Sequence, residues 1–211
     1  KRNKVKAFKQ LRTSGGGNHY VEFGVVSITD TMNPWQLKVG DYIGVLSHSG
    51  SRGLGANIAK HYTYLATKQC PLPKNVQHLA WLDLNTHDGQ EYWLAMNLAG
   101  DYAKACHDDI HIRIGKLLGA RAVVKIENHH NFAWKEIVND KECIVHRKGA
   151  TPASLGALGI IPGSMTAPGY IVRGLGNSES LGSASHGAGR LQSRRKCKDQ
   201  FTRSDIKQQL K

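Results

Sequence analysis

The stretch SGGGNHYVEFGVVSI (residues 14–28) places a glycine-rich loop directly before a run in which apolar residues alternate with others. Glycine lets the loop turn sharply and approach a ligand closely, whereas the period-two pattern of residues 20–28 is typical of a β-strand. His19 lies where the loop meets the strand. The stretch therefore predicts a strand with chemically active side chains gathered in the loop at its end.

The same organisation, a strand bordered by a polar loop, recurs along the chain. Apolar and alternating runs predict further strands at residues 41–47, 122–127, 142–150 and 170–175. Helical spacing of apolar residues predicts helices at residues 1–12, 53–67 and 91–119, of which the last is the longest. This mixture predicts an α+β fold. Because no stretch is long enough to be a linker, we expect a single domain over residues 1–211.

Charge and cysteine content narrow the class of protein. The chain has 211 residues and a net charge of +13, which favours a polyanionic partner such as nucleic acid, the alternative being an ordinary basic surface. The first residues lack the apolar core of a secretory signal. Its four cysteines are scattered, which excludes a disulfide framework and a zinc ribbon and favours free thiols in the cytoplasm: Cys70, Cys106, Cys143 and Cys197.

Histidines recur in five glycine-, serine- or asparagine-rich loops: GGGNHYVE (15–22), HSGSRGLG (48–55), ENHHNFAW (127–134), HRKGATPA (146–153) with IPGSM (161–165), and SASHGAGR (183–190). Taken singly, each loop is better explained by a turn or by a hydrogen-bonded surface or core histidine. Together they favour a phosphate site with metal-binding imidazoles, because five independent coincidences would otherwise be needed. His129 and His130 are neighbours, so we expect only one of them to face such a site.

In this order, these strings together with YIVRGLGN (170–177) resemble the RtcB family of RNA-splicing ligases over nearly the whole chain. The resemblance implies an RtcB-like α+β fold, with mixed β-sheets, flanking helices and a central cleft lined by histidines. It also implies an activity. Members of the family join RNA 3′-phosphate or 2′,3′-cyclic phosphate ends to 5′-hydroxyl ends, using GTP and two Mn²⁺ ions.

The resemblance also implies roles for individual residues. His186 matches the histidine that becomes covalently bonded to GMP. Three imidazoles match the metal ligands: His19, His48 and His130. The nucleotide pocket would comprise Asn18, Tyr20, Glu22, Ser164, Ser185, Ala188 and Gly189. RNA phosphates would be bound by Arg52 and Arg190, with Arg147 and Lys148 on the same basic rim.

Strand alternation adds a geometric expectation about the first of these loops. It places Asn18, Tyr20 and Glu22 on one face of the predicted strand and His19 on the other, unless the strand starts only after a turn. Nucleotide and metal would then lie on opposite faces of the strand.

Two parts of the family pattern are missing from this sequence. The family has an Asp-x-x-Cys-Gly segment before GGGNH, but residues 1–14 contain neither Asp nor Cys. The family also continues further beyond the HGAGR motif than Lys211. We therefore expect an RtcB body trimmed at both ends: a fragment, a split-gene product or an inactive homologue. A partner chain or another segment would supply the missing Asp and Cys.

Two other functions fit the same residues. An inactive or partial homologue would keep the basic surface and the loops and act as an RNA- or nucleotide-binding module. A metal-dependent phosphoesterase would use the histidine cluster to hydrolyse simple phosphomonoesters. Transfer of a nucleotide to the protein distinguishes the ligase from both alternatives, because neither of them forms a covalent nucleotide intermediate.

Overall fold

The computed structural model describes residues 2–164, 167–187, 189 and 191–209. The chain divides into two compact units, Lys1–Val124 (the first unit) and Lys125–Lys211 (the second unit). The single domain expected for residues 1–211 stays a prediction.

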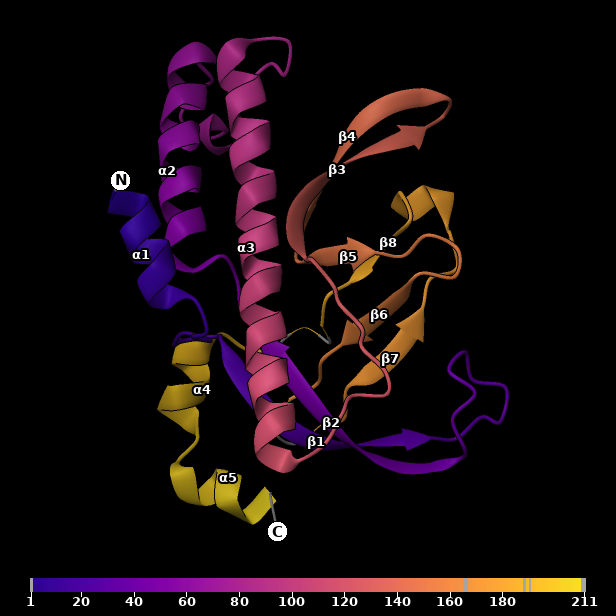
Figure 1. The fold of residues 1–211 in the computed structure, drawn as a ribbon. Coiled ribbons are helices and arrows are strands. Elements are labelled where there is room, and N and C mark those ends of the chain that lie inside the picture. The colour runs from indigo at the N-terminus through magenta and orange to yellow at the C-terminus, as the bar shows by residue number, and fades with distance from the viewer. Residues whose placement is uncertain (1, 165–166, 188, 190, 210–211) are drawn as a thin grey trace. The chain divides into compact units, whose positions relative to one another are not determined.

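Helices form most of the first unit (Figure 1): α1 (Arg2–Gln10), α2 (Arg52–Gln69), the 3₁₀ turn η1 (Gln77–Leu79) and α3 (His87–Leu118). The α2 and α3 helices lie side by side, and α1 lies next to α2. Most of the buried side chains of α2 and α3 are small or of moderate size, which allows close helix packing. The buried residues are Tyr62, Ala66, Ala99, Ala103, Cys106 and Ile110.

Both ends of α3 are capped by residues that favour helix ends. Thr86 is its N-cap, and the threonine hydroxyl accepts a hydrogen bond from the backbone N–H of Gly89 at 3.2 Å. Gly119 ends the helix in the left-handed conformation, with φ of 61°, which glycine adopts without steric cost. These caps explain why α3 begins four residues before the predicted start of 91 and still ends where the sequence indicates.

The first unit also contains an antiparallel hairpin of β1 (Tyr20–Ile28) and β2 (Gly40–His48). The register pairs Tyr20 with His48 at one end of the hairpin and Ile28 with Gly40 at the other. The end that holds Tyr20 and His48 therefore brings together the loops before β1 and after β2.

In the second unit, β3 (Asn131–Val138) pairs antiparallel with β4 (Lys141–Lys148). Asn139 and Asp140 connect the two strands, and both have positive φ values, 51° and 60°. Two consecutive left-handed residues are typical of the type I′ turn, whose twist matches that of a hairpin.

Two shorter antiparallel pairs complete the sheets among the described residues: β5 (Ala150–Pro152) with β8 (Ser183–Ser185), and β6 (Leu158–Ile161) with β7 (Tyr170–Arg173). Asn128 links the pairs, because its amide nitrogen donates to Thr151 Oγ1 at 2.9 Å and its amide oxygen accepts from the backbone N–H of Ile160 at 3.0 Å. The remaining elements are η2 (Ser178–Ser180), α4 (Arg194–Gln200) and α5 (Arg203–Gln209).

The predicted α+β class is confirmed, as are the helices near residues 1–12, 53–67 and 91–119 and the strands near 41–47 and 170–175. The predicted buried strand at 122–127 is wrong, since no described strand pairs with it and Val123 is 73% exposed. The strand predicted at 142–150 is divided at Gly149, where φ is 67°. None of the described helices is long and apolar enough to cross a membrane.

Candidate functional site

His48 is the last residue of β2 and lies directly across the hairpin from Tyr20. Their rings stack, with centroids 5.4 Å apart and planes inclined by 12°. Cross-strand partners on one face of a sheet have closely spaced β-carbons, so this contact follows from the register. The pair places one imidazole and one phenol, both half-buried, at the end of the hairpin.

His19 precedes β1, and its ring centroid lies 6.2 Å from that of His48. The Nδ1 atom of His19 is buried and has no hydrogen-bond partner among the described residues. Burial, followed by electrostatic interaction with Arg52 and then with His107, lowers the pKa of His19 below its ordinary value. A neutral imidazole with an unsatisfied buried nitrogen is a suitable ligand for a divalent cation.

The expected separation of His19 and Tyr20 on opposite faces is not observed, because both rings approach His48. The strand begins only at Tyr20, after a turn, so the alternation does not extend back to residues 18 and 19. Asn18 and Glu22, two predicted nucleotide contacts, are exposed near the same end of the hairpin.

Arg52 also belongs to this end of the hairpin. Its Nε donates to Thr13 Oγ1 at 3.1 Å, and the side chain is half-buried. A β-carbon at Gly15 would collide with the guanidinium and come within 2.6 Å of His19 Nδ1. The glycine, which has φ of 106°, therefore leaves room for the arginine to lie beside the imidazole.

Ser47, His107 and His111 form a polar cluster that the sequence analysis did not find. The Ser47 hydroxyl lies 2.6 Å from His107 Nδ1 and 2.7 Å from His111 Nε2. The two histidines are four residues apart on α3, so their side chains share one helix face. That spacing was the available signal in the sequence, although it does not reveal the serine.

In the second unit, the rings of His130 and His186 have centroids 4.8 Å apart and are inclined by 35°. His129 instead approaches Phe132, at 5.3 Å between centroids. The two neighbouring imidazoles thus lie against different rings, and the expectation that only one of them faces a metal site stays a prediction. His130 and His186 come from segments 56 positions apart in the chain, brought together where β5 pairs with β8.

The backbone of Gly149 forms hydrogen bonds with the backbones of both histidines. Its N–H donates to the carbonyl oxygen of His130 at 2.7 Å, and its own carbonyl oxygen accepts from the N–H of His186 at 3.4 Å. A β-carbon at Gly149 would lie 3.4 Å from Cε1 and 3.5 Å from Nδ1 of His186. With φ of 67°, this position favours glycine, and its small size lets the imidazole pack against the backbone.

Arg147 does not lie on a basic rim, so that prediction is wrong. Its side chain is only 3% exposed, and its guanidinium binds both carboxylate oxygens of Glu136 at 2.6 and 2.8 Å. It also donates to Ser183 Oγ at 2.8 Å and to the carbonyl oxygen of Leu181 at 2.9 Å, and it lies 5.0 Å from the centre of the Trp134 ring. These contacts attach β4 to β8, the strand that ends immediately before His186.

The remaining predicted residues of the second unit are Ser164, Ser185, Ala188, Gly189 and Arg190. Ser185 is exposed, and its hydroxyl donates to the carbonyl oxygen of Gly187 at 2.5 Å. Ser164 is exposed and forms an isolated bridge with Ala167, while Gly189 is exposed with φ of 78°. Ala188 and Arg190 lie outside the described residues.

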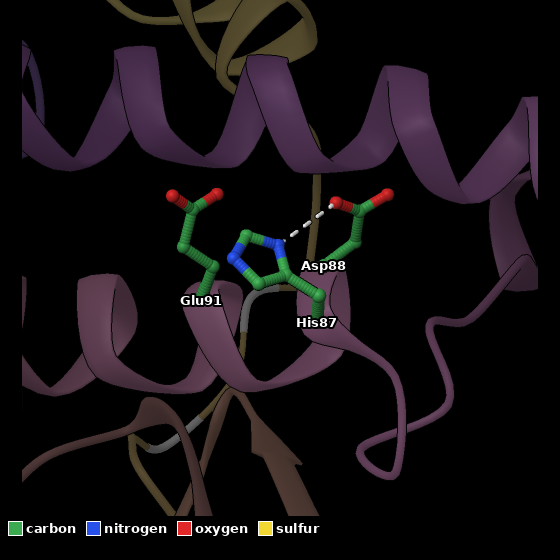
Figure 2. Close-up of side chains that lie close together, drawn as sticks. All are labelled: His87, Asp88 and Glu91. Atoms are coloured by element: carbon green, nitrogen blue, oxygen red, sulfur yellow. Dashed lines mark ion pairs between the residues drawn. The ribbon is translucent and has the colours of Figure 1, made fainter.

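Among the described residues, one group of three or more acidic, histidine or cysteine side chains is close enough to hold a cation: His87, Asp88 and Glu91 (Figure 2). The carboxylates already accept hydrogen bonds, Asp88 from Gln69 at 2.5 Å and Glu91 from Tyr62 at 3.1 Å. His87 is 87% exposed. The group lies at the start of α3, where the helix dipole attracts anions and opposes a cation. We therefore assign it to stabilising the helix.

The whole chain matches a known protein family. A model of the family described as tRNA-splicing ligase RtcB matches residues 1–211. The chain belongs to the RtcB family. Its RtcB relatives include the RNA-splicing ligase RtcB of Escherichia coli strain K12, which is 36% identical over 94% of this chain and 49% of the relative.

Two further relatives extend the comparison to other organisms. The RNA-splicing ligase RtcB homolog 1 of Entamoeba dispar is 33% identical over 99% of this chain and 45% of its own length. The tRNA-splicing ligase RtcB of Pyrococcus abyssi is 30% identical over 99% of this chain and 26% of its own length. This RtcB chain thus spans about half, or less, of the length of the curated relatives it matches.

Proposed function

We propose that this chain is the catalytic body of an RNA ligase, which joins 3′-phosphate or 2′,3′-cyclic phosphate ends to 5′-hydroxyl ends through a covalent histidine–GMP intermediate. Membership of the RtcB family supports the reaction class. The observation that carries the assignment of residues is the approach of His130 to His186, at 4.8 Å between ring centroids.

His186 would be the nucleophile. The ring edge formed by Cε1 and Nδ1 faces Gly149, which leaves Nε2 as the nitrogen farther from that backbone. In the proposed step, Nε2 attacks the α-phosphorus of GTP, an N–P bond forms, and the bond to pyrophosphate breaks. The resulting phosphoramidate is a reactive donor, so the GMP group can pass to an RNA 3′-phosphate and provide a leaving group for the 5′-hydroxyl to displace.

The histidines fit a divalent cation, which is Mn²⁺ in the family. His19, with its buried and unsatisfied Nδ1, and His48 would bind a cation in the first unit, and His130 would bind one in the second. A cation there would neutralise the charge that develops on the phosphate during transfer. Because burial and nearby positive charges lower the pKa of His19, its imidazole would be neutral and ready to bind metal near pH 7.

GTP and RNA would be held by the polar groups around these histidines. The nucleotide contacts proposed from the resemblance are Asn18, Tyr20, Glu22, Ser164, Ser185, Ala188 and Gly189. Arg52 lies beside His19, where its guanidinium is suited to bind a phosphate oxygen pair. The net charge of +13 supports attraction of an RNA backbone.

Covalent labelling tests this proposal directly. Incubation with GTP labelled at the α-phosphate and with Mn²⁺ is expected to label the protein at one histidine, located as His186 by peptide mass spectrometry. His186→Ala should abolish the label, whereas His61→Ala, which changes an exposed histidine of α2, should leave it intact. A label that survives His186→Ala would overturn the assignment, and metal binding without any label would count against ligase activity of this chain by itself.

A second function, RNA or nucleotide binding without ligation, is favoured by one observation. Among the described residues, no carboxylate or thiolate completes a three-group metal site with the histidines of the proposed centre. Neutral imidazoles alone bring no negative charge to offset two cations. Salt-dependent RNA binding with no label at His186 would support this alternative. Restoration of the label by a partner chain that contributes Asp and Cys would support the ligase.

A further inference from the structure

Ser47 joins the end of the hairpin to α3 through its hydroxyl group. The hydroxyl has one hydrogen, so it can donate to only one of the two imidazole nitrogens that it contacts. The other nitrogen must carry a hydrogen and donate to the serine oxygen. With distances of 2.6 Å to His107 and 2.7 Å to His111, both contacts are within the range of a hydrogen bond.

The α3 helix holds this pair of imidazoles in a defined place. His107 follows Cys106, which is fully buried, and His111 follows Ile110, which is 8% exposed. The buried stripe of the helix thus fixes the rotation of α3 about its axis, and with it the direction of the neighbouring face. Both histidines are half-buried, so their side chains have less rotational freedom than surface residues.

Ser47 immediately precedes His48, the proposed metal ligand, in the same strand. An isolated two-stranded hairpin is only marginally stable, and its ends fray most easily. The hydrogen bonds at Ser47 counter that fraying at the end where His48 stacks on Tyr20 and approaches His19. Because successive strand residues point to opposite faces, Ser47 can bind α3 while leaving the ring of His48 to the other face.

We propose that Ser47, His107 and His111 are positioning residues, which hold the end of β2 so that His48 and His19 together bind one divalent cation. The inference rests on the proposed function, because it takes these two histidines as metal ligands. It adds three residues to the site for which neither the family resemblance nor the relatives suggested a role. Outer contacts that orient metal-binding histidines commonly change metal affinity by about 10- to 100-fold when removed.

The test measures Mn²⁺ affinity by calorimetry, without GTP or RNA, in a His130→Ala background that removes the proposed ligand of the second unit. Ser47→Ala is expected to weaken binding about tenfold, near the lower limit for contacts of this kind. Ser47→Thr keeps the hydroxyl and should restore most of the affinity. Ser27→Ala is the matched control, since it removes a 2.7 Å hydrogen bond to Asp41 near the opposite end of the same hairpin.

The outcomes separate this inference from the proposed function. If the background protein binds Mn²⁺ and Ser47→Ala binds it equally well, the positioning role is wrong. If the background protein binds none, the metal role of His19 and His48 fails, and the inference fails with it. His107→Gln and His111→Gln should each weaken binding without changing the number of ions bound. Loss of one bound ion would mean that these histidines are themselves ligands and would overturn the positioning role.

Discussion

His19 and His48 in the first unit are held by contacts of a different kind from those around His130 and His186 in the second. Near the first pair, the strand end is fixed by hydrogen bonds between the Ser47 hydroxyl and two imidazoles from α3. Near the second pair, β8 is attached by a buried guanidinium that binds a carboxylate, a hydroxyl and a carbonyl group.

This difference affects folding stability and the tolerance of each unit to mutation. A neutral hydrogen bond contributes about 1 kcal/mol to stability, and its loss leaves groups that water can partly satisfy. Removing one member of a buried ion pair leaves a charge without compensation, at a cost of about 3 to 5 kcal/mol. We therefore expect the second unit to be the more sensitive to a single substitution, and the first unit to tolerate changes that alter mainly metal binding.

The largest effect is expected for Arg147→Ala. The substitution removes four hydrogen bonds and leaves the half-buried Glu136 carboxylate without its guanidinium partner. The free energy of unfolding of the second unit should therefore fall by about 3 kcal/mol. Urea unfolding monitored by hydrogen exchange of peptides from residues 131–149 measures this loss. Arg173→Ala, which changes an exposed arginine of β7, is the control. Equal unfolding midpoints for the two variants would contradict the difference between the units.

Gly149→Ala is expected to have the next largest effect. A left-handed backbone costs a residue with a β-carbon about 1 to 2 kcal/mol, and φ at this position is 67°. The added carbon would also touch the His186 ring. We expect a lower unfolding midpoint together with slower GMP labelling. Gly156→Ala, at a φ of 80° with open space around it, should cost similar stability but leave the labelling rate unchanged.

Ser47→Ala should cost the first unit about 1 kcal/mol, less than either change in the second unit. Hydrogen exchange in peptides that cover the end of β2 and residues 104–114 of α3 measures the local loss. Protection in the second unit should be unchanged. A loss of stability as large as that of Arg147→Ala would show that neutral and charged contacts do not differ as proposed.

The smallest effect is expected on acidification. Hydrogen bonds from Arg147 lower the pKa of Glu136 below 4.5, with burial acting in the opposite direction. The carboxylate therefore stabilises the folded state above pH 4.5, and this contribution is lost as the pH falls through the lower folded-state pKa. Urea midpoints of the wild-type protein should decline over that range. Glu136→Gln should be less stable at neutral pH and decline less, and an unchanged decline would assign the effect to other groups.

Regular elements with a strong local pattern could be predicted from the sequence. The alternation of residues 20–28 and the helical spacing of residues 91–119 both correspond to observed elements. The apolar run at 122–127 is as regular, yet it forms no strand, since a strand needs a neighbour to pair with. Only the second strand of the β3–β4 hairpin was predicted from the sequence, whereas β3 and the left-handed turn at Asn139 and Asp140 were not.

Arg147 and Ser47 show the limit of prediction for the site. A sequence shows that Arg147 is charged, but only its burial against Glu136 and Trp134 shows that it is structural. Ser47 looks like any strand serine, whereas its partners are 60 and 64 residues further along the chain. Both roles depend on which groups exclude water around the side chain, and that depends on the packing of distant segments.

The sequence by itself determined the protein family, the loops that carry the histidines and most of the elements that border them. These depend on residue type and on spacing over a few positions, where backbone preferences act. Only the tertiary structure decided that His186 meets His130 across Gly149, that β8 is attached through Arg147, and that α3 binds the end of β2. Contacts between distant segments depend on burial and on the partners that folding brings near, which no local pattern records.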